Sequence, residues 1–392
     1  MVSIRIRIWI RGYITLTNGS GFGSRRPKKF GSEESGFGSG SVGSGFGSPT
    51  LPLVISDLIH NGSFMFFKCY RYRFDKETVV RLTEQLPNLE RPNDRGRPLT
   101  PIQQVCITLG YFGGGQLTRI AGLCGGVSQK AAWWAIRRVT SELADLKGQV
   151  IRMPTDVECE ATARRLEGRY HLPGFAFGVD GTVVKFEDAP REIPDDTVQQ
   201  DFWCRKMHYA INCQIVGNDE GLILDLNADW QGSTNDARIW ANSPVKHIIN
   251  RQRRFLVAGD SAYPISETCI TPYRVAEAAA DPSKRLFNKR HSGLRTRCTE
   301  NLYGRLKKRM RVLKLLRCKY EYARETVIAC CVLHNIGILW ADRDPEDGQM
   351  PPPAAPVPVV APPVVPEDDE EPALVRARGQ ALRDRLRLNM PR

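Results

Sequence analysis

The stretch FLVAGDSAYP, residues 255–264, decides the fold of this chain, because an apolar run stops abruptly at an acidic residue. The residues from Phe255 to Ala258 are typical of a short buried strand, which ends at Gly259-Asp260. In open α/β sheets the functional groups gather at the ends of strands. Asp260 is therefore either a carboxylate held at the rim of a sheet or the cap of a following helix.

A second carboxylate has the same setting in GFAFGVD, residues 174–180. This run and VVKF, residues 183–186, flank the pair Asp180-Gly181, which predicts two strands joined by a tight turn. Asp180 is accordingly a turn residue or a second carboxylate at a strand end. Taken singly, each of the two acids has a structural explanation.

The surrounding segments predict a mixed sheet covered by helices. HYAINCQIV (208–216) and GLILDLNADW (221–230) alternate with period two around the turn residues 217–219, as the strands of a hairpin do. A loop and helix follow in residues 233–250, a long helix over about 292–314, and an apolar, buried helix over 324–340. Residues 168–340 are thus expected to form an α/β layer structure.

A smaller helical region precedes this sheet, over residues 76–148. Thr100 before Pro101 predicts a helix start, glycines at 113–115 and 125–126 predict breaks, and Ser128 predicts the start of a third helix. That third helix carries the basic residues Lys130, Arg137 and Arg138. A helix, a glycine turn and a basic helix suggest a DNA-binding helix-turn-helix; a plain three-helix bundle with solvated arginines is the alternative.

The two ends of the chain have compositions that differ from the rest. Residues 1–50 contain a Gly/Ser/Phe low-complexity tail, with the basic cluster RRPKK at 25–29 as a candidate nuclear import signal. Residues 341–392 begin with a Pro-rich, then acidic, linker and end in a segment that predicts a short basic helix. Both ends are therefore expected to lie outside the folded regions, apart from that helix.

The charge balance indicates a polyanionic partner. The chain has 392 residues, with 56 Lys and Arg against 43 Asp and Glu, a net charge of +13 and a pI near 9.3. Such a basic balance favours nucleic acid as a partner. No apolar run approaches the roughly 18 residues that a membrane span requires. We therefore expect a nucleic acid as the partner and no membrane span, although charge alone does not separate DNA, RNA and membrane surfaces.

A third acid stands among these basic residues. Between Lys289 and Lys319 there are twelve Lys or Arg and a single acid, Glu300. In an α-helix Glu300 would lie about 200° from Cys298, away from the apolar stripe. One interpretation is a surface salt bridge with Lys307 or Arg297. The other is that the helix would repel itself unless a polyanion such as DNA neutralised it. The apolar stripe comprises Cys298, Leu302, Leu306, Met310 and Leu313.

Six ordered motifs resemble the PIF/Harbinger transposases and the nucleases derived from them. They are GVDGT (178–182), RKMHYAINCQIV (205–216), GSTNDARIW (232–240), AGDSAYP (258–264), RTRCTENLYGRLKKRM (295–310) and CCVLHNI (330–336). The resemblance covers about residues 85–340. It implies an RNase H-like fold, preceded by the helix-turn-helix, and a DDE triad of metal ligands that falls on Asp180, Asp260 and Glu300.

The activity implied by the resemblance is cleavage of DNA phosphodiester bonds by two-metal-ion hydrolysis, with Mg²⁺ or Mn²⁺ as cofactor. Such ions prefer carboxylate and phosphate oxygens, which suits a site made of Asp and Glu. The basic residues expected to contact the DNA are Lys130, Arg137, Arg138, Arg297, Lys307 and Arg311. The alternative is a domesticated, catalytically inactive transposase that acts as a DNA-binding or scaffold protein.

The chain departs from the family pattern at two positions, where Val183 and Asn235 stand in place of histidines. Neither position is a triad carboxylate, so the departures concern proton transfer or positioning. Asp236, the next residue, either assists the site or caps the following helix, and the cap is the favoured interpretation. The resemblance also implies a nuclear protein and a Myb-like DNA-binding protein as partner, and it leaves homo-oligomers open.

Overall fold

Strand β1 (Phe175–Lys185) is the centre of a mixed sheet in the computed structural model, which describes residues 72–90, 98–114, 127–342 and 371–391. It pairs antiparallel with β3 (His208–Gly217) and parallel with β5 (Leu256–Ala258). Beyond these, β4 (Ile223–Gln231) pairs with β3, and β6 (Cys269–Ile270) pairs with β5. The short β2 (Trp203–Cys204) pairs with the start of β3.

The predicted turn at Asp180-Gly181 is wrong, because β1 is one continuous strand of 11 residues. Residues 178–185 are all paired with residues 210–217 of β3. The β3 strand supplies backbone partners for residues 178–185 as one run, whereas a turn at Asp180-Gly181 would have paired the two halves of the run with each other. Asp180 therefore lies inside a strand and two residues beyond the part that pairs with β5.

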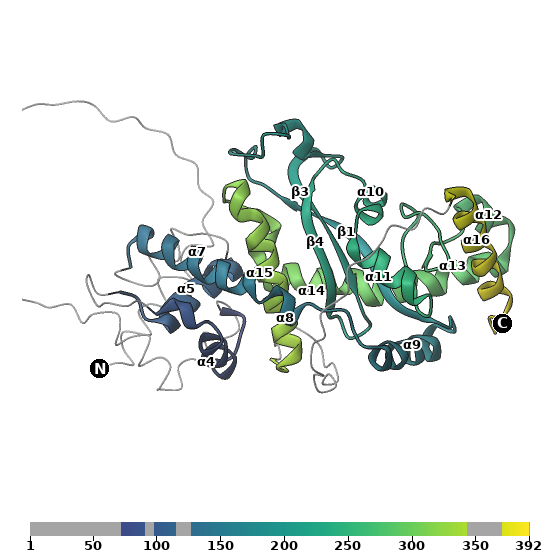
Figure 1. Cartoon of the computed structure of the whole chain (residues 1–392), viewed down its shortest axis with the longest axis horizontal. Coiled ribbons are helices and arrows are strands. Elements are labelled where there is room, and N and C mark those ends of the chain that lie inside the picture. Colours follow the sequence, from purple (N-terminus) through teal and green to yellow (C-terminus); the bar gives the residue numbers. More distant parts are fainter. Residues whose placement is uncertain (1–71, 91–97, 115–126, 343–370, 392) are drawn as a thin grey trace, which may run out of the picture. The chain divides into compact units, whose positions relative to one another are not determined.

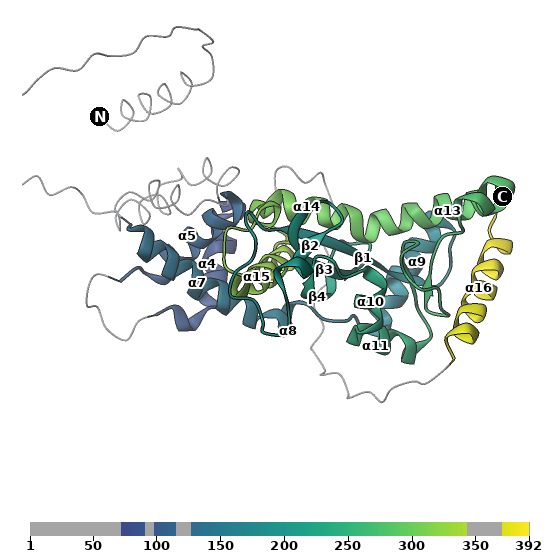
Figure 2. The same ribbon diagram turned by 90° about the horizontal axis from the view of Figure 1, so that it is seen from above.

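Helices cover both faces of the sheet, as predicted. Helices α14 (Asn301–Arg309) and α15 (Tyr320–Leu339) share a hydrophobic cluster with β3 and β4 on one face. On the other face, α10 (Asp236–Ala241) and α11 (Pro244–Gln252) pack through Trp240, Val245 and Ile249. Figure 2 shows α14 on one side of the strands and α10 and α11 on the opposite side.

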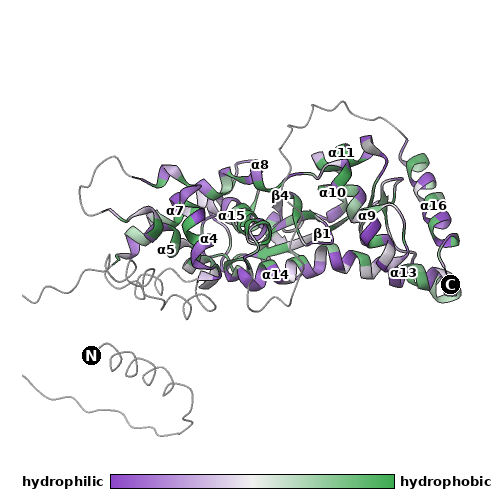
Figure 3. Cartoon of the chain, turned by 90° about the horizontal axis from the view of Figure 1, so that it is seen from below, coloured by the Kyte–Doolittle hydropathy of each residue, from purple (hydrophilic) through white to green (hydrophobic). Residues whose placement is uncertain are grey.

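The predicted long helix over 292–314 is interrupted. Helix α13 (Pro282–Arg295) leads into a π-helical turn (Thr296–Glu300), then α14, and then a 3₁₀ turn (Arg311–Lys314). The predicted apolar stripe is confirmed, since its five residues are at most 2% exposed. Hydrophilic residues recur along α13 and α14 (Figure 3), so this helical rod lies between the core and solvent.

The helical region before the sheet contains α4 (Lys76–Glu84), α5 (Pro101–Gly114), α7 (Gln129–Asp145) and the short α8 (Lys147–Val150). Two predicted caps are confirmed: Thr100 and Gln103 exchange hydrogen bonds, and the Ser128 hydroxyl accepts one from the Ala131 N–H. The middle helix of the predicted helix-turn-helix lies in residues 115–126, outside the described residues.

One hydrophobic cluster joins these helices to the sheet region. It includes residues of α4, α5 and α7 together with residues of β3, β4, α14 and α15. Figure 1 shows α5 and α7 next to α15. Arg309 of α14 is buried beneath the Phe74 ring and pairs with Asp342 at 3.0 Å, so a charged pair also ties the start of the described chain to the sheet region.

Two helices of the described chain were not predicted, and a third matches the short basic helix predicted near the end of the sequence. Helix α9 (Asp156–Tyr170) precedes β1, and α12 (Val275–Ala280) precedes α13; neither was predicted. The short basic helix expected near the end of the chain is α16 (Pro372–Leu388). Leu386 of α16 is buried in a cluster with Phe287 and Leu294 of α13, while Leu374, near the start of α16, is 47% exposed.

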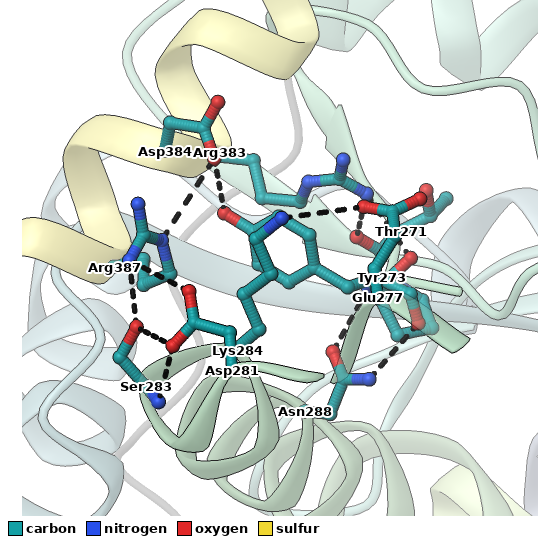
Figure 4. A network of polar contacts seen from close by, with 11 residues as sticks. Thr271, Tyr273, Glu277, Asp281, Ser283, Lys284, Asn288, Arg383, Asp384 and Arg387 are labelled. Atoms are coloured by element: carbon teal, nitrogen blue, oxygen red, sulfur yellow. Dashed lines mark hydrogen bonds and ion pairs between the residues drawn. The ribbon is translucent and has the colours of Figure 1, made fainter. Parts of the chain in front are cut away.

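Polar contacts hold α16 against the segment that follows β6 (Figure 4). The Arg383 guanidinium lies 3.9 Å from the Tyr273 ring centroid, and the Tyr273 hydroxyl donates to Asp384 at 2.5 Å. Arg387 donates to the Ser283 hydroxyl at 2.6 Å and pairs with Asp281. These contacts anchor the chain on either side of α12.

Within the described ranges, no helix has the length and apolar character needed to cross a lipid bilayer. The predicted tail of residues 1–50, its basic cluster and the Pro-rich and acidic linker lie outside the described residues.

Candidate active site at the ends of strands β1 and β5

The parallel pairing of β1 and β5 brings two of the predicted acids to the same edge of the sheet. Gly178 is in register with Ala258, and each strand has an acid two residues later, Asp180 and Asp260. Since neighbouring strands lie about 5 Å apart, the two acids follow adjacent strands at matching positions. Asp260 thus follows the end of β5 as predicted, whereas Asp180 lies within β1, at the point where β1 extends beyond its parallel partner.

Asp260 shapes the turn that leaves β5. Its Oδ1 accepts a hydrogen bond from the Ala262 N–H at 2.8 Å, and the Tyr263 N–H donates to the Asp260 carbonyl. The alternative role, the cap of a following helix, is wrong, because the next helix begins only at Val275. Asp260 is half-buried, and one of its carboxylate oxygens has no hydrogen bond to the described residues that the structure records.

Glu300 reaches the same site through the π-helical turn. The wider turn, closed by the Asn301 N–H bonding to the Thr296 carbonyl, brings Glu300 back beside Arg295. Arg295 Nη2 donates to Glu300 Oε1 at 2.6 Å, and Arg295 Nη1 lies 3.3 Å from Asp180 Oδ2. A single guanidinium thus joins the first and third acids of the predicted triad.

The prediction that Glu300 forms a salt bridge with Lys307 or Arg297 is wrong, because its ion-pair partner is Arg295. An α-helix was assumed in that prediction, whereas the π turn changes the angle between Glu300 and its neighbours. The partners of Glu300 are Arg295 and the Thr296 hydroxyl, which donates to Oε2 at 2.8 Å. Glu300 itself lies at the solvent edge, with 44% of its side chain exposed.

Two glycines let the π turn approach the sheet. Gly178 of β1 and Gly217 of β3 are paired with each other, and both face Cys298. A Cβ at Gly178 would lie 2.8 Å from the Cys298 Cβ, and one at Gly217 would lie 2.4 Å from the Cys298 carbonyl oxygen. Larger residues at either position would push the turn away from Asp180. The Tyr303 hydroxyl, which donates to the Asp180 carbonyl at 2.6 Å, holds the same side of the strand.

A fourth carboxylate, Asp236, joins the site from the opposite face of β1. Asp180 and Thr182 face α14, so Gly181 faces the α10 side, where Asp236 begins its helix. A Cβ at Gly181 would lie 2.3 Å from Asp236 Oδ1, so this carboxylate rests against the strand next to Asp180. Asn212 of β3 donates to Asp236 Oδ1 at 3.2 Å and holds it there.

The interpretation of Asp236 as a helix cap is wrong, because Asn235 has that role. The Asn235 side chain accepts from the Arg238 N–H at 2.8 Å, and Asp236 is the first residue of α10. Two residues that both favour caps stand side by side in the sequence, and only one can occupy the position. That redundancy was the available signal that Asp236 is free for another role.

Burial and like charges raise the pKa of Asp180 to about 6. Burial is the largest cause, Asp260 and Asp236 add to the rise, and the Arg295 guanidinium opposes it. Burial likewise raises the pKa of Asp236, with Asp260 contributing. Three aspartates thus repel one another at one edge of the sheet, an arrangement that a bound cation would stabilise.

The donor set of this site suits a hard divalent cation. Asp180, Asp260, Glu300 and Asp236 offer only carboxylate oxygens, which Mg²⁺ and Mn²⁺ prefer. In the described part of the chain, no three His, Cys, Asp or Glu side chains converge as ready-made metal ligands. At this site Arg295 lies between two of the acids, and its charge already compensates them.

Three of the basic residues predicted to contact DNA belong to α7. Lys130 is exposed near the start of the helix. Arg137 pairs with Glu325 of α15 at 2.9 Å, with its guanidinium 3.3 Å from the Tyr322 ring centroid. Arg138 donates to the Asn88 carbonyl at 2.6 Å. Of these three cations, Lys130 alone has no hydrogen bond or ion pair that the structure records among the described residues.

The other three follow the π turn. Arg297 lies on the turn itself and is half-buried, and Arg311 is exposed in the 3₁₀ turn after α14. Lys307 points at the sheet, where Nζ donates to the Thr182 hydroxyl at 2.7 Å and to the Val183 carbonyl at 2.9 Å. Burial lowers the pKa of Lys307. Lys307 is therefore held against β1, two and three residues beyond Asp180, while Arg311 lies at the surface.

Comparison with known proteins gives a family match for the stretch that contains this site. Residues 179–335 match the family described as "DDE superfamily endonuclease". "Putative nuclease HARBI1" of Homo sapiens is 27% identical over 278 residues, which cover 68% of this chain and 76% of that protein. The Mus musculus protein of the same name is 26% identical over 297 residues, covering 72% and 81%. No solved structure matches the chain.

A plant relative extends the comparison. "Protein ALP1-like" of Arabidopsis thaliana is 23% identical over 273 residues, which cover 65% of each chain. The stretch matched to the endonuclease family begins one residue before Asp180 and includes Asp236, Asp260 and Glu300. Residues 179–335 therefore match the model of the DDE superfamily endonucleases, and the chain is similar to relatives named as putative nucleases, in agreement with the resemblance of its motifs.

Proposed function

We propose that this chain is a metal-dependent DNA endonuclease or transposase of the Harbinger type, in which Asp180, Asp260 and Glu300 hold the metal. The observation that carries the proposal is that Arg295 contacts the first and third acids, while the second acid follows the strand next to β1. The register of β1 and β5 aligns Asp180 with Asp260, and the π turn places Glu300 on the guanidinium that also contacts Asp180.

The order of the strands supports an RNase H-like fold for the nuclease domain. Strands β4, β3 and β1 are neighbours and antiparallel, and β5 and β6 continue the sheet on the other side of β1 in parallel. The acids lie where β1 leaves its parallel partner. A site at such strand ends, with helices covering both faces, is a rigid support for charged groups that must not move apart.

The residues that would hold Mg²⁺ or Mn²⁺ are Asp180, Asp260 and Glu300, with Asp236 beside them. When bound, a pair of such ions supplies an activated water and stabilises the leaving oxygen in phosphodiester hydrolysis. The chain's own residues keep the carboxylates in place. Tyr303 fixes the Asp180 carbonyl, Thr296 fixes Glu300, and Asn212 fixes Asp236.

Exposed cations near the site would contact the DNA backbone. We assign this role first to Arg297 and Arg311, and to Lys130 if α7 belongs to a helix-turn-helix. Arg137, Arg138 and Lys307 have intramolecular partners that they would have to exchange for phosphate. Phosphate contacts of this kind give affinity without reading sequence. A nuclear location, a Myb-like DNA-binding partner and a homo-oligomer belong to the same proposal through the family.

The proposal is tested by cleavage of supercoiled plasmid and of a labelled duplex, with Mg²⁺ or Mn²⁺. Asp260→Asn removes one charge at the site and should abolish cleavage, whereas Asp188→Asn, in the exposed loop after β1, should retain it. Both variants should melt within a few degrees of the parent protein. Cleavage that is the same for the parent chain and Asp260→Asn would refute the assignment.

A second candidate function is DNA binding without cleavage. It is favoured by Val183 and Asn235 at the two positions where the family pattern has histidine, and by Arg295, which compensates two of the acids without metal. A tight DNA complex with no cleavage in either metal, at several pH values, would establish it over the first candidate.

A further inference from the structure

One guanidinium occupies the oxygens that a metal ion would need. Arg295 Nη1 lies 3.3 Å from Asp180 Oδ2, and its Nη2 lies 2.6 Å from Glu300 Oε1. The side chains of Arg295 and Asp180 are 18% and 17% exposed, so water screens this pair little. Both contacts come from the two-pronged planar head of arginine, which suits two separate carboxylates.

The bridge that Arg295 forms between Asp180 and Glu300 depends on the π turn. Arg295 and Glu300 are five residues apart, which in an α-helix would place them about 140° apart around the axis. The π turn over Thr296–Glu300 brings Arg295 and Glu300 to the same side of the helix. The Thr296 hydroxyl donates a hydrogen bond to the second carboxylate oxygen of Glu300. Turns of this type occur as local features, frequently at functional sites. Here the turn aligns a cation with two acids of the site.

We propose, on the basis of the function inferred above, that Arg295 is a counter-cation of Asp180 and Glu300 and that a divalent ion must displace it from them. Binding of the metal by Asp180 and Glu300 and bridging by Arg295 would use the same oxygens. Two cations competing for one pair of carboxylates exclude one another, because each gains its stabilisation from the same negative charge.

The bridge explains how the metal-free protein tolerates its own acids. Asp180, Asp260 and Asp236 repel one another, as the raised pKa values of Asp180 and Asp236 indicate, and Arg295 is the cation that opposes this for Asp180. Once displaced, the Arg295 head remains at the rim of the site. A guanidinium there is suited to a phosphate oxygen of the substrate, which it would bind in two-pronged fashion.

A purely structural role for Arg295 leads to the opposite result for the metal. If the bridge only positioned Glu300, its loss would loosen the site and leave metal affinity unchanged or weaker. If Arg295 competes with the metal, its loss must strengthen metal binding while destabilising the metal-free protein. The sign of the change in affinity therefore separates the two roles.

The experiment measures Mn²⁺ binding in the absence of DNA, by electron paramagnetic resonance of free Mn²⁺ and by calorimetry. The variant is Arg295→Gln, which keeps a polar side chain and removes the charge. Arg297→Gln is the matched control, since it removes the same charge from the same turn and from a residue without a recorded contact to the acids. Arg295→Lys keeps the charge but cannot contact both carboxylates at once.

We expect Arg295→Gln to bind Mn²⁺ at least about fivefold more tightly than the parent chain. Arg297→Gln should stay within about twofold, and Arg295→Lys should fall between the two. Without metal, Arg295→Gln should melt at a lower temperature than the parent, and added Mn²⁺ should raise its melting temperature by a larger amount.

Equal or weaker Mn²⁺ binding by a folded Arg295→Gln protein would overturn the inference. The parent chain and Asp260→Asn make its failure distinguishable from failure of the proposed function. If the parent binds Mn²⁺, Asp260→Asn does not, and Arg295→Gln equals the parent, only the displacement of Arg295 is refuted. If the parent and every variant fail to bind Mn²⁺, the metal site and the displacement are refuted together.

Discussion

The Asp236 carboxylate lies directly against the backbone of Gly181. This contact exists because the central strand lacks a side chain at one position, on the face opposite to Asp180. A fourth acid thereby reaches the end of β1 across the strand. The relationship links a glycine of the GVDGT motif to an aspartate of the GSTNDARIW motif, two segments that are far apart in the sequence.

Substitution Gly181→Ala should displace Asp236 and impair both cleavage and stability. The new Cβ would collide with Oδ1, which Asn212 holds in place, so we expect a loss of about 1–3 kcal/mol in the free energy of unfolding. Cleavage should fall about tenfold or more, since small displacements at a site are costly. Urea unfolding and plasmid nicking measure the two effects.

The control for that substitution is Gly168→Ala in α9, where a Cβ would meet nothing within 4 Å. An alanine in a helix should increase stability by about 0.5–1 kcal/mol and leave cleavage unchanged. A Gly181→Ala protein that cleaves as fast as the Gly168→Ala protein would show that Asp236 has no part in the site.

Substitution of an exposed arginine and substitution of an arginine with intramolecular contacts should have different effects on DNA binding. Arg311→Gln should lower the slope of log affinity against log salt by about one and leave stability unchanged, because Arg311 is exposed. Arg137→Gln should leave the slope unchanged and cost about 1 kcal/mol of stability, since it removes the contacts with Glu325 and Tyr322. Fluorescence titrations at several salt concentrations measure the slopes; a lower slope for Arg137→Gln would place α7 on the DNA.

Acid should destabilise the protein through His334. Burial lowers the pKa of His334 to about 3, and its Nε2–H donates to the Gly221 carbonyl at 2.9 Å. Because the folded pKa lies below the unfolded value of about 6.5, this contribution is complete above pH 6.5 and is lost as the pH falls toward 3. The loss amounts to about 2 kcal/mol by pH 5.

The variant His334→Gln retains an N–H donor and cannot titrate. Its free energy of unfolding should decline about 2 kcal/mol less than that of the parent between pH 7 and pH 5. Denaturant unfolding at both pH values provides the measurement, with His247→Gln on α11 as control. Identical declines for the parent and His334→Gln would contradict the assigned pKa.

Two leucines of α16 test whether this helix is part of the folded protein. Leu386 is 8% exposed and packs with Phe287 and Leu294, whereas Leu388, two residues later, is 70% exposed. Leu386→Ala should cost about 2–3 kcal/mol of stability, and Leu388→Ala less than about 0.5 kcal/mol. Equal losses in urea unfolding would mean that α16 does not pack as described.

The parts of the fold that sequence predicted well are those fixed by burial. Period-two alternation found β3 and β4, and helical spacing found the stripe from Cys298 to Leu313, because each residue's burial follows from its own position in a repeating geometry. Asp180 and Asp260 could be proposed as site residues because each ends an apolar run that is visible in the sequence.

The parts that sequence missed depend on partners distant in the chain. The turn predicted at Asp180-Gly181 was replaced by a continuous strand because β3 pairs with the whole segment. The π turn, and with it the partner of Glu300, depends on how closely Cys298 approaches Gly178 and Gly217. Asp236 could not be assigned to the site without knowing that Gly181 faces it.

The position of α16 bears on how the nuclease domain can be isolated. The match to the endonuclease family ends at residue 335, but the backbone of Ser266, just before β6, lies against Gly379, and Arg383 donates to the carbonyls of Thr271 and Pro272 just after it. A recombinant fragment cut at the family boundary would expose an outermost strand to solvent. An exposed edge strand can pair with the same strand of another molecule. We therefore expect such a fragment to aggregate under conditions in which the chain that includes α16 does not.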